Sequence, residues 1–547
     1  MACGITTTLI TTGTTDRRNC STITTKIALV NLEISTTIGT GEAKAEDDAE
    51  QAAAPKQLEK HPMKTTFLSL SLLLLITTLS AQNESDALRY TQSNIIGTAR
   101  YSAMGGAFAA LGADFSCLSS NPAGIAAFRK SEISLSPAIY HQSIQSTFNN
   151  SSNSDSKYNV NLGNIGLVMT FNTQHNSDKE NRWISWNLGL GYNRINDFNQ
   201  RLHSAGPNSL GSSLSHIFVQ AANGRTWQQL DDFAEGLAFN TYVIDSTKGN
   251  NTKYFSKVPS SIQQKKSVFN SGNMGETVFS AGGNYANKLF VGATIGIQNI
   301  NYGENSTYSE LAQKTDSSTT FKSFDFTQHF STTGTGINIK IGAIYRVNEW
   351  LRFGAAFHSP TAFTLRDDYH YSMHSAFKTG SYETESPLGY FNYTIVTAPR
   401  IMGSLGFTIA QKAMIGIDIE FIDYRNSRLN SNVDGFVNAN EKTQNNFNAA
   451  NNLRIGGEWF FSGPFALRLG YSIIGNPYQS SVNTNAQRTN WSAGVGYRNK
   501  GVFIDAAYVL TQYNENYFLY NPDLEPNNAV QNKFSATNFI ASFGFKF

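Results

Sequence analysis

The fold is indicated most clearly by residues 183–193, WISWNLGLGYN. Large apolar side chains alternate in it with small or polar ones, and the apolar set consists of Ile184, Trp186, Leu188, Leu190 and Tyr192. Because successive side chains of a β-strand point to opposite faces, this period of two predicts a strand with one apolar face. Soluble sandwiches and membrane barrels both contain such strands, so the lengths of the strands and their connections must decide between them.

Fourteen segments of the chain fit strands of this kind, which is an even number. They are 131–140, 158–172, 183–197, 275–285, 289–303, 324–346, 351–367, 390–409, 414–424, 451–461, 465–474, 488–497, 502–511 and 535–547. Aromatic residues crowd the strand ends, where a girdle at the membrane interface would lie. They include Trp350, Tyr424, Trp459, Tyr471, Trp491 and Tyr497.

The connections between these segments alternate in length. The tight ones are 286–288, 347–350, 410–413, 462–464 and 498–501, whereas 173–182 is longer than a tight turn. The long ones are 198–274, 304–323, 368–389, 425–450 and 512–534. Short turns on one side and long loops on the other are typical of outer membrane barrels, whose strands need about 9 to 11 residues to cross. The sequence therefore predicts an all-β fold, a 14-stranded antiparallel transmembrane β-barrel over residues 131–547.

Composition excludes several other classes of protein. Of the 547 residues only 15% are charged, 12% are aromatic and 44 are glycine, a balance that argues against a cytosolic enzyme and against a disordered chain. The net charge of +2 leaves no basic surface for nucleic acid. A mean hydropathy of −0.30, without an apolar run of about 18 residues, argues against a bundle of transmembrane helices.

The segment from Met63, MKTTFLSLSLLLLITTLSAQN, has the layout of a signal peptide over residues 63–81. Lys64 provides the positive start, 67–76 the apolar core, and Ser80-Ala81 the small residues before cleavage at Gln82. A buried helix is the alternative. Residues 1–62 then form either an over-extended start or a disordered leader. Cleavage removes Cys3 and Cys20, so Cys117 remains alone and no intramolecular disulfide is expected.

The last segment, TNFIASFGFKF, places Phe539, Phe543, Phe545 and Phe547 on one face. Bacterial outer membrane barrels commonly end on an aromatic residue that the barrel assembly machinery reads. We therefore interpret Phe547 as the assembly signal, against the alternative of an ordinary terminal strand.

Residues 87–137, ALRYTQSNIIGTARYSAMGGAFAALGADFSCLSSNPAGIAAFRKSEISLSP, precede and enter the first strand. The run GGAFAALGAD, from Gly105 to Asp114, and the motif Asn121-Pro122-Ala123-Gly124 resemble the FadL/OmpP1/TodX family of outer membrane transporters for hydrophobic compounds. Together with the strand count and Phe547, the resemblance covers residues 85–547.

The resemblance implies a hatch inside the barrel lumen, which we assign to residues 82–130. Its motif residues are Asn121, Pro122, Ala123, Gly105 and Gly106. It also implies that extracellular loops capture the ligand, which leaves sideways through a gap near the third strand. Gly189 and Gly191 are the evident places for a bend in that strand. A tightly packed helix or loop is the alternative interpretation of the Gly/Ala run.

The long connection 198–274 contains apolar residues at helical spacing, which predicts a helix. Trp227, Leu230, Phe233 and Leu237 on its apolar face are candidates for a ligand-capture surface. A helix that merely packs on its own loop explains the spacing equally well.

Charged residues on the expected lumen face are Lys340, Arg400, Asp418, Glu420, Arg454, Glu458, Arg468 and Asp505. Their usual role in a barrel is to pair with one another and hold the plug. If the ligand is a fatty acid, its carboxylate would contact one of Lys340, Arg400, Arg454 or Arg468. Nearby apolar residues suited to an alkyl chain are Ile344, Met402, Met414 and Phe460. The same register points Ile417 to lipid and Gly416 to the lumen, so that Gly416→Ser should be tolerated.

Catalysis and cofactors have little support in the sequence. His370 and His374 share a strand face, but they lack the further ligands of a metal or haem site. No Ser-His-Asp or paired-carboxylate arrangement stands out, so neither an enzyme nor a cofactor is expected.

The sequence and the resemblance together predict a bacterial outer membrane protein that takes up long-chain fatty acids or other hydrophobic compounds passively. Its expected partners are the hydrophobic ligand, outer membrane lipid and the assembly machinery, with no nucleic acid. The alternative is a barrel of the same fold that acts as a scaffold or secretion-associated protein and binds a protein partner through the connection 198–274.

Overall fold

The computed structural model describes residues 84–173, 182–313, 319–410 and 412–547. The predicted leader 1–62, the predicted signal peptide 63–81 and most of the connection 173–182 lie outside these ranges. Within them, none of the helices is long and apolar enough to span a membrane.

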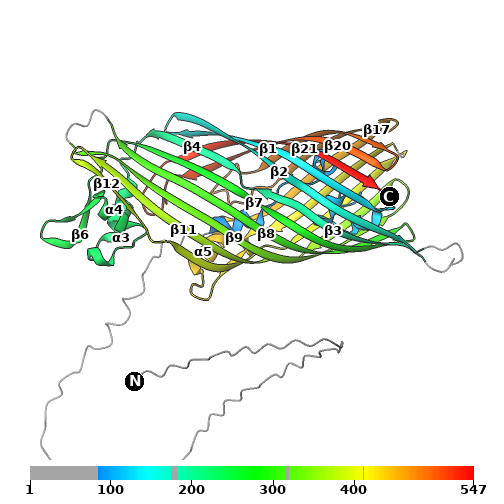
Figure 1. The fold of residues 1–547 in the computed structure, drawn as a ribbon, viewed down its shortest axis with the longest axis horizontal. Helices are drawn as coiled ribbons and strands as arrows, with labels where there is room; N and C mark the ends of the chain where they lie inside the picture. The colour runs from blue at the N-terminus through cyan, green and yellow to red at the C-terminus, as the bar shows by residue number, and fades with distance from the viewer. Residues whose placement is uncertain (1–83, 174–181, 314–318, 411) are drawn as a thin grey trace, which may run out of the picture. The chain divides into compact units, whose positions relative to one another are not determined.

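The strands form one antiparallel barrel that closes on itself (Figure 1). Closure is made by β1 (Glu132–Phe148), which pairs with β2 (Ser151–Asn172) on one side and β21 (Ala529–Lys546) on the other. The other wall strands are β3 (Trp183–Asp197), β4 (Gln200–Pro207), β7 (Ile262–Tyr285), β8 (Leu289–Ala312), β9 (Phe321–Arg346), β10 (Leu351–His358), β11 (Ala362–Phe377), β13 (Gly389–Val396), β14 (Arg400–Ile409), β15 (Ala413–Asp423), β16 (Arg428–Asn430), β17 (Ala449–Ser462), β18 (Phe465–Ile474), β19 (Arg488–Asn499) and β20 (Val502–Phe518). Four wall strands are each broken into two parts, namely β3 with β4, β10 with β11, β13 with β14, and β15 with β16. Counted in this way the described wall has the 14 strands that the sequence predicts.

The side-chain alternation of WISWNLGLGYN sets the two faces of the wall, as predicted. Trp186, Leu188 and Leu190 are 45–48% exposed on the outside, whereas Asn187 is fully buried inside. Phe539, Phe543 and Phe545 of the last strand are likewise exposed. Exposed apolar side chains over a belt of this kind suit contact with lipid.

Several strands continue well beyond the segments predicted from the sequence, in part through predicted long loops such as 304–323. β1 and β2 continue to a two-residue turn at Asn149-Asn150, where both residues have positive φ (45° and 67°). β8 and β9 likewise extend to Ala312 and from Phe321. Outside lipid neither face needs to be apolar, so the hydrophobic period vanishes while the hydrogen-bonded ladder continues.

The connection 198–274 is also not a single loop. It begins as β4 and ends within β7, and an insert of residues 208–261 lies between them. The insert contains α3 (Leu214–Ala222), the 3-10 helix η3 (Trp227–Gln229), α4 (Glu235–Asn240), β5 (Ile244–Thr247) and β6 (Asn250–Ser256). Ile217, Phe218 and Leu237 of the insert share one apolar core with Tyr308 and Phe324 of the wall. The insert therefore packs onto the long-loop end of the barrel, where it is visible in Figure 1.

Residues 84–128 form a hatch inside the barrel. It consists of α1 (Glu84–Thr91), α2 (Ala99–Ala103), the 3-10 helix η1 (Phe115–Ser119) and the 3-10 helix η2 (Pro122–Ala127). Glycines of the wall allow its backbone to approach closely, because a Cβ atom at Gly456 would lie 2.2 Å from the Met104 carbonyl oxygen. Gly416 faces the lumen as predicted, yet the predicted tolerance of Gly416→Ser is wrong. A Cβ atom there would lie 2.2 Å from the Ala107 carbonyl oxygen, since the hatch fills the space that an empty lumen would leave.

Short elements complete the described chain. β12 (Gly380–Glu385) extends β11 as a hairpin beyond the wall, and β5 and β6 form a separate two-stranded sheet. The 3-10 helix η4 (Tyr424–Asn426) and α5 (Val437–Asn446) lie in the connection between β15 and β17.

Candidate functional site

One group of lumen charges ties the hatch to the barrel. The guanidinium of Arg100 in α2 lies 2.7 Å from a carboxylate oxygen of Glu458, and Arg468 lies 2.5 Å from the other oxygen. Asp505 forms a second salt bridge with Arg468, with 2.7 Å between Oδ1 and Nη1, and a third with Arg498. Burial alone lowers the pKa of Arg100, but the Glu458 carboxylate outweighs it and holds that pKa above the ordinary value. Arg468 is fully buried and contacts both carboxylates, of which Glu458 is shared with Arg100 and Asp505 with Arg498.

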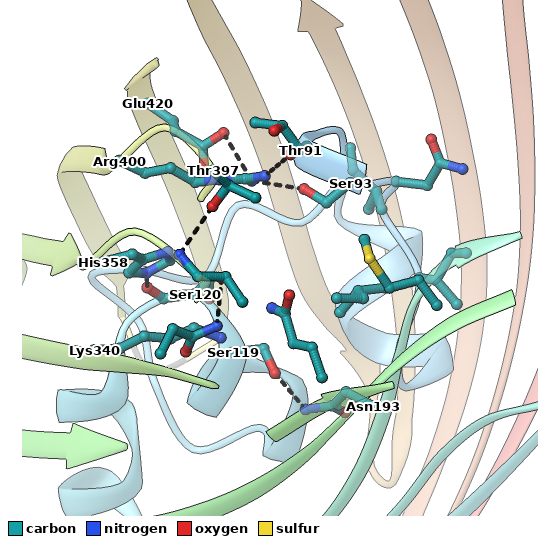
Figure 2. A pocket seen from close by; sticks show the side chains of 18 of the residues that line it. Thr91, Ser93, Ser119, Ser120, Asn193, Lys340, His358, Thr397, Arg400 and Glu420 are labelled. Atoms are coloured by element: carbon teal, nitrogen blue, oxygen red, sulfur yellow. Dashed lines mark hydrogen bonds and ion pairs between the residues drawn. The ribbon is translucent and has the colours of Figure 1, made fainter. Parts of the chain in front are cut away.

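Lys340, Arg400 and Arg454, which the sequence suggested as contacts for a ligand carboxylate, line a polar cavity of about 80 Å³ (Figure 2). Lys340 donates to both oxygens of Glu276, at 2.6 and 2.5 Å. Arg454 and Arg400 share Glu420, at 3.2 and 3.7 Å. The structure thus brings Lys340, Arg400 and Arg454 together but leaves Arg468 in the other group.

Hatch residues close this polar cavity on one side. Arg400 donates to the hydroxyl of Ser93 at 2.7 Å and to the carbonyl oxygen of Thr91, and Figure 2 shows it reaching toward both. The ring of His358 donates through Nε2 to the Ser120 carbonyl oxygen at 2.6 Å. Burial raises the pKa of Tyr101, another lining residue, to about 12, so it remains a neutral phenol. The cavity is small and polar, with three cations around the carboxylates of Glu276 and Glu420, which suits water better than an alkyl chain.

A larger cavity of about 300 Å³ lies on the long-loop side of the hatch. We call it the aromatic cavity, because its lining includes Tyr140, Phe198, Tyr302, Tyr478, Tyr513 and Phe534. The rings of Tyr513 and Phe534 stack with centroids 4.4 Å apart. Its size falls at the lower end of the range of small-molecule sites, about 300 to 1,000 Å³.

Two arginines line the aromatic cavity, and of these Arg89 is paired with Asp86 whereas Arg488 is not paired with a carboxylate among the described residues. The guanidinium carbon of Arg488 lies 4.6 Å from the centroid of the Tyr513 ring. Nη2 donates to Gln92 Oε1 at 2.7 Å and Nη1 to Asn94 Oδ1 at 3.3 Å, both in the hatch. Within the described chain Arg488 forms no salt bridge. Sequence reasoning missed this residue, although the strand register that places Asn490 and Ser492 in the lumen also points Arg488 inward.

The hatch segment Asn94–Ile96 separates the two cavities and lines both of them. Its backbone is held by β3, because Asn94 N donates to the Ile195 carbonyl oxygen at 2.9 Å. The side chains of Asn94 and Asn196 add a hydrogen bond of 2.7 Å, from Nδ2 to Oδ1. A displacement of this segment would join the two cavities.

Beside this segment the ladder between β2 and β3 ends, at Asn164 and Asn193. Among the described residues, Ser151–Gly163 of β2 have no ladder partner on that side, and we call this unpaired edge of β2 the seam. β3 changes register at Arg194–Asn196, and β4 continues along β7. The hatch reaches the end of this seam, since a Cβ atom at Gly163 would lie 3.1 Å from the Gly97 carbonyl oxygen.

Gly189 and Gly191 lie before this change of register, where β3 is paired on both sides. A Cβ atom at Gly189 would lie 2.8 Å from Cδ1 of Ile125, and one at Gly191 would lie 2.2 Å from the Ile165 carbonyl oxygen. These glycines therefore provide room for close packing, and the register of β3 against β7 shifts at Arg194–Asn196.

The hatch motif around Asn121 is buried and holds its own fold. Asn121 Oδ1 accepts from Ala123 N at 3.1 Å, and Nδ2 donates to the Ala109 carbonyl oxygen at 2.6 Å. Pro122 begins η2, where its missing N–H costs nothing. Gly105 and Gly106 adopt positive φ (61° and 78°) in the turn after α2.

The expected capture surface is divided between two short helices. Trp227 in η3 is 57% exposed, whereas Leu230 and Leu237 are buried in the core shared with the wall. Phe233 packs on Tyr369 with ring centroids 5.1 Å apart. The single helix predicted from the spacing is wrong, because residues 230–234 turn between η3 and α4 to fill that core.

The remaining predicted residues lie apart from the cavities. His370 and His374 lie near carboxylates of Glu385 and Asp325, at 3.4 and 3.9 Å. Across the described residues, no group of three His, Cys, Asp or Glu side chains is arranged to hold a metal ion. Phe547 follows β21, and its backbone N–H donates to the Ser131 carbonyl oxygen at 3.0 Å.

Comparison with known proteins identifies the fold and the family. Residues 76–547 match the family described as "Outer membrane protein transport protein (OMPP1/FadL/TodX)". A Pseudomonas aeruginosa FadL homologue is similar in structure, with a TM-score of 0.51, 12% identity, and 84% of this chain and 100% of that one covered. The Pseudomonas putida toluene transporter TodX gives a TM-score of 0.48 and 13% identity over 83% of this chain and 99% of that one. A comparison with curated protein sequences finds no match.

Proposed function

Because the chain belongs to the OMPP1/FadL/TodX family of outer membrane transport proteins, we propose that it takes up long-chain fatty acids or related amphiphiles by passive transport. The observation that carries this proposal is the aromatic cavity above the hatch, with the cation Arg488 in its lining. In barrels of this type the tight turns face the periplasm, so the aromatic cavity opens toward the extracellular half.

Burial of the ligand body supports binding in this cavity. Each buried CH₂ contributes about 0.8 kcal/mol, so an alkyl chain among Phe198, Tyr513 and Phe534 gains affinity with its length. The carboxylate of the ligand pairs with Arg488, because a charge-assisted hydrogen bond is the strong kind. Lys340, Arg400, Arg454 and Arg468 already have carboxylate partners, which makes them weaker candidates for this contact.

The seam supports release through the wall. It begins in the apolar belt at Leu162–Asn164, directly beside the hatch segment Asn94–Gly97. A ligand that displaces this segment would leave sideways between β2 and β3 into the lipid, as the resemblance to the family implies. No covalent chemistry is required on this route. Export to the outer membrane through the signal peptide 63–81 is part of the same proposal.

Mass spectrometry of lipid extracted from the purified barrel tests this function. We expect fatty acids or similar amphiphiles at near-stoichiometric amounts, and a barrel free of any such molecule would argue against uptake. The alternative, a scaffold, is favoured by the exposed Trp227 on the insert. Stable capture of a secreted protein that is lost when Trp227 is replaced would support that alternative.

A further inference from the structure

A cluster of cations lies on the outer wall along the seam. The ring of Phe269 on β7 has the Lys157 ammonium 3.8 Å from its centroid and the Arg201 guanidinium carbon 5.1 Å away. Lys157 starts on the lumen-side face of β2, opposite Gln142 of β1, and its ammonium reaches this ring across the seam, where it also donates to the Asn270 carbonyl oxygen at 2.9 Å. Because both cations contact the same aromatic ring, two positive charges lie close together at this place on the wall.

Register adds two further basic side chains to this place. In the β4–β7 ladder Arg201 lies opposite Phe269, His203 opposite Ser267, and Ala205 opposite Lys265. Because side chains alternate along a strand, Arg201, His203 and Lys265 point to the same outer face as Phe269. We call Lys157, Arg201, His203 and Lys265 the seam cluster.

The seam cluster keeps a net positive charge. Arg201 and Lys265 are exposed, and no member of the cluster forms a salt bridge with the described residues. Two carboxylates attract members of the cluster electrostatically: Asp155 attracts His203, and Asp197 attracts Lys157. Asp197 already forms a salt bridge with Arg194 at 2.7 Å. Lys157, Arg201 and Lys265 therefore face at most one carboxylate that is free to neutralise them.

Exposed apolar side chains extend along β2 as far as the cluster. The outward side chains of β2 are apolar at Leu162, Val160 and Tyr158, of which Val160 is 77% and Tyr158 71% exposed. Farther along the strand they become Ser156, Ser154 and Ser152. On β2 the apolar side chains thus end at Tyr158, next to Lys157, whereas on β7 Asn273 and Ser271 lie between Phe279 and the cluster. Acyl chains that follow β2 would therefore bring lipid headgroups to the cluster.

We propose that the seam cluster binds the phosphate groups of an outer-leaflet lipid whose acyl chains lie against the apolar residues of β2. Arg201 offers the paired donors that match a phosphate, and Lys265 and Lys157 add charge around it. The bound lipid covers the edge of β2 that has no ladder partner. This inference does not depend on which compound the barrel transports.

Native mass spectrometry of the intact barrel with added diphosphoryl lipid A tests the proposal. Each Lys or Arg near an anionic lipid surface contributes about fivefold in affinity, so Arg201→Gln with Lys265→Gln should weaken lipid A binding roughly tenfold or more. The charge-conserving pair Arg201→Lys with Lys265→Arg should retain most of the binding. Lipid A stripped of its phosphates should bind the unaltered barrel as weakly as diphosphoryl lipid A binds the glutamine pair.

A matched control removes the same charge elsewhere on the exposed wall. Lys322→Gln with Lys533→Gln changes two exposed lysines outside the seam and should leave lipid A binding unchanged. Equal binding by the glutamine pair and the unaltered barrel would overturn the proposal. It would indicate that these cations only protect a free strand edge from pairing with other chains. A loss of the same size in the control pair would also overturn it, because binding would then follow overall charge.

Discussion

The guanidinium of Arg488 lies over the ring of Tyr513, 4.6 Å from its centroid, in the wall of a cavity that the hatch closes from below. The Glu515 carboxylate lines the same cavity and attracts Arg488, but it accepts a hydrogen bond from Tyr478 and forms no salt bridge with Arg488 within the described chain. An acidic ligand that pairs with Arg488 would be linked to the hatch through the bonds of Arg488 to Gln92 and Asn94.

Arg488→Gln should weaken oleate binding by about 10- to 100-fold, because a hydrogen bond to a charged group contributes about 1.5 to 3 kcal/mol. Binding of a neutral hydrocarbon such as decane should stay within about twofold, since its contacts are the unchanged aromatic rings. Isothermal titration of the purified barrel with both ligands measures the difference. A parallel loss for decane would mean that Arg488 supports the cavity and not the head group.

Gly416→Ala should destabilise the barrel by about 1 to 3 kcal/mol, the usual cost of overpacking, because the new Cβ meets the Ala107 carbonyl oxygen. Gly403→Ala is the matched control, since nothing lies within 4 Å of a Cβ atom there. The temperature at which each barrel unfolds on an unboiled electrophoresis gel gives the comparison. Equal unfolding temperatures would place the hatch farther from β15 than the structure does.

Asn121→Ala should loosen the hatch without emptying the lumen, because it removes the cap of η2 and the bond to the Ala109 carbonyl oxygen. Loss of a cap costs about 0.5 to 2 kcal/mol. We expect reduced oleate uptake with little leakage of small solutes.

Deletion of residues 85–129, in contrast, should leave a closed wall that conducts ions in a planar bilayer. A deletion variant with the conductance of the intact barrel would show that this segment is not a plug.

A disulfide between cysteines at positions 94 and 196 should hold the hatch segment against β3. The backbone N–H of Asn94 donates to the Ile195 carbonyl oxygen at 2.9 Å and the Asn94 and Asn196 side chains are hydrogen-bonded, so Asn94→Cys with Asn196→Cys puts the two cysteines on neighbouring backbone segments. Oxidised protein should lose oleate transport and regain it on reduction, while each single cysteine variant stays active. Transport that continues with the disulfide formed, as verified by mass, would exclude release past this segment.

The wall could be predicted from sequence because lipid imposes a simple rule. Leu188 must face outward and Asn187 inward over the whole belt, so the alternation appears directly in the residues. Beyond the belt neither face of a strand must be apolar, so the alternating pattern disappears. The hairpin of β1 and β2 around Asn149-Asn150 is rich in serine and asparagine and therefore could not be recognised from hydrophobicity.

The site was less accessible to sequence reasoning. Lys340 and Arg468 were recognisable as lumen charges, but their carboxylate partners lie on other strands or in other segments, and pairing depends on three-dimensional neighbours. Arg488 is the first residue of the predicted strand 488–497, and its contacts with Tyr513 and with the hatch come from segments distant in sequence. Gly189 and Gly191 look like a bend, whereas their lack of a side chain makes room for neighbouring backbone and hatch atoms.

The most direct test of the account is uptake of radiolabelled oleate by bacterial cells that lack their own outer membrane fatty acid transporter. Expression of this chain should restore uptake well above the background of cells with an empty vector, and Arg488→Gln should reduce it. Folded barrel in the outer membrane with oleate uptake no higher than background would contradict the proposed function.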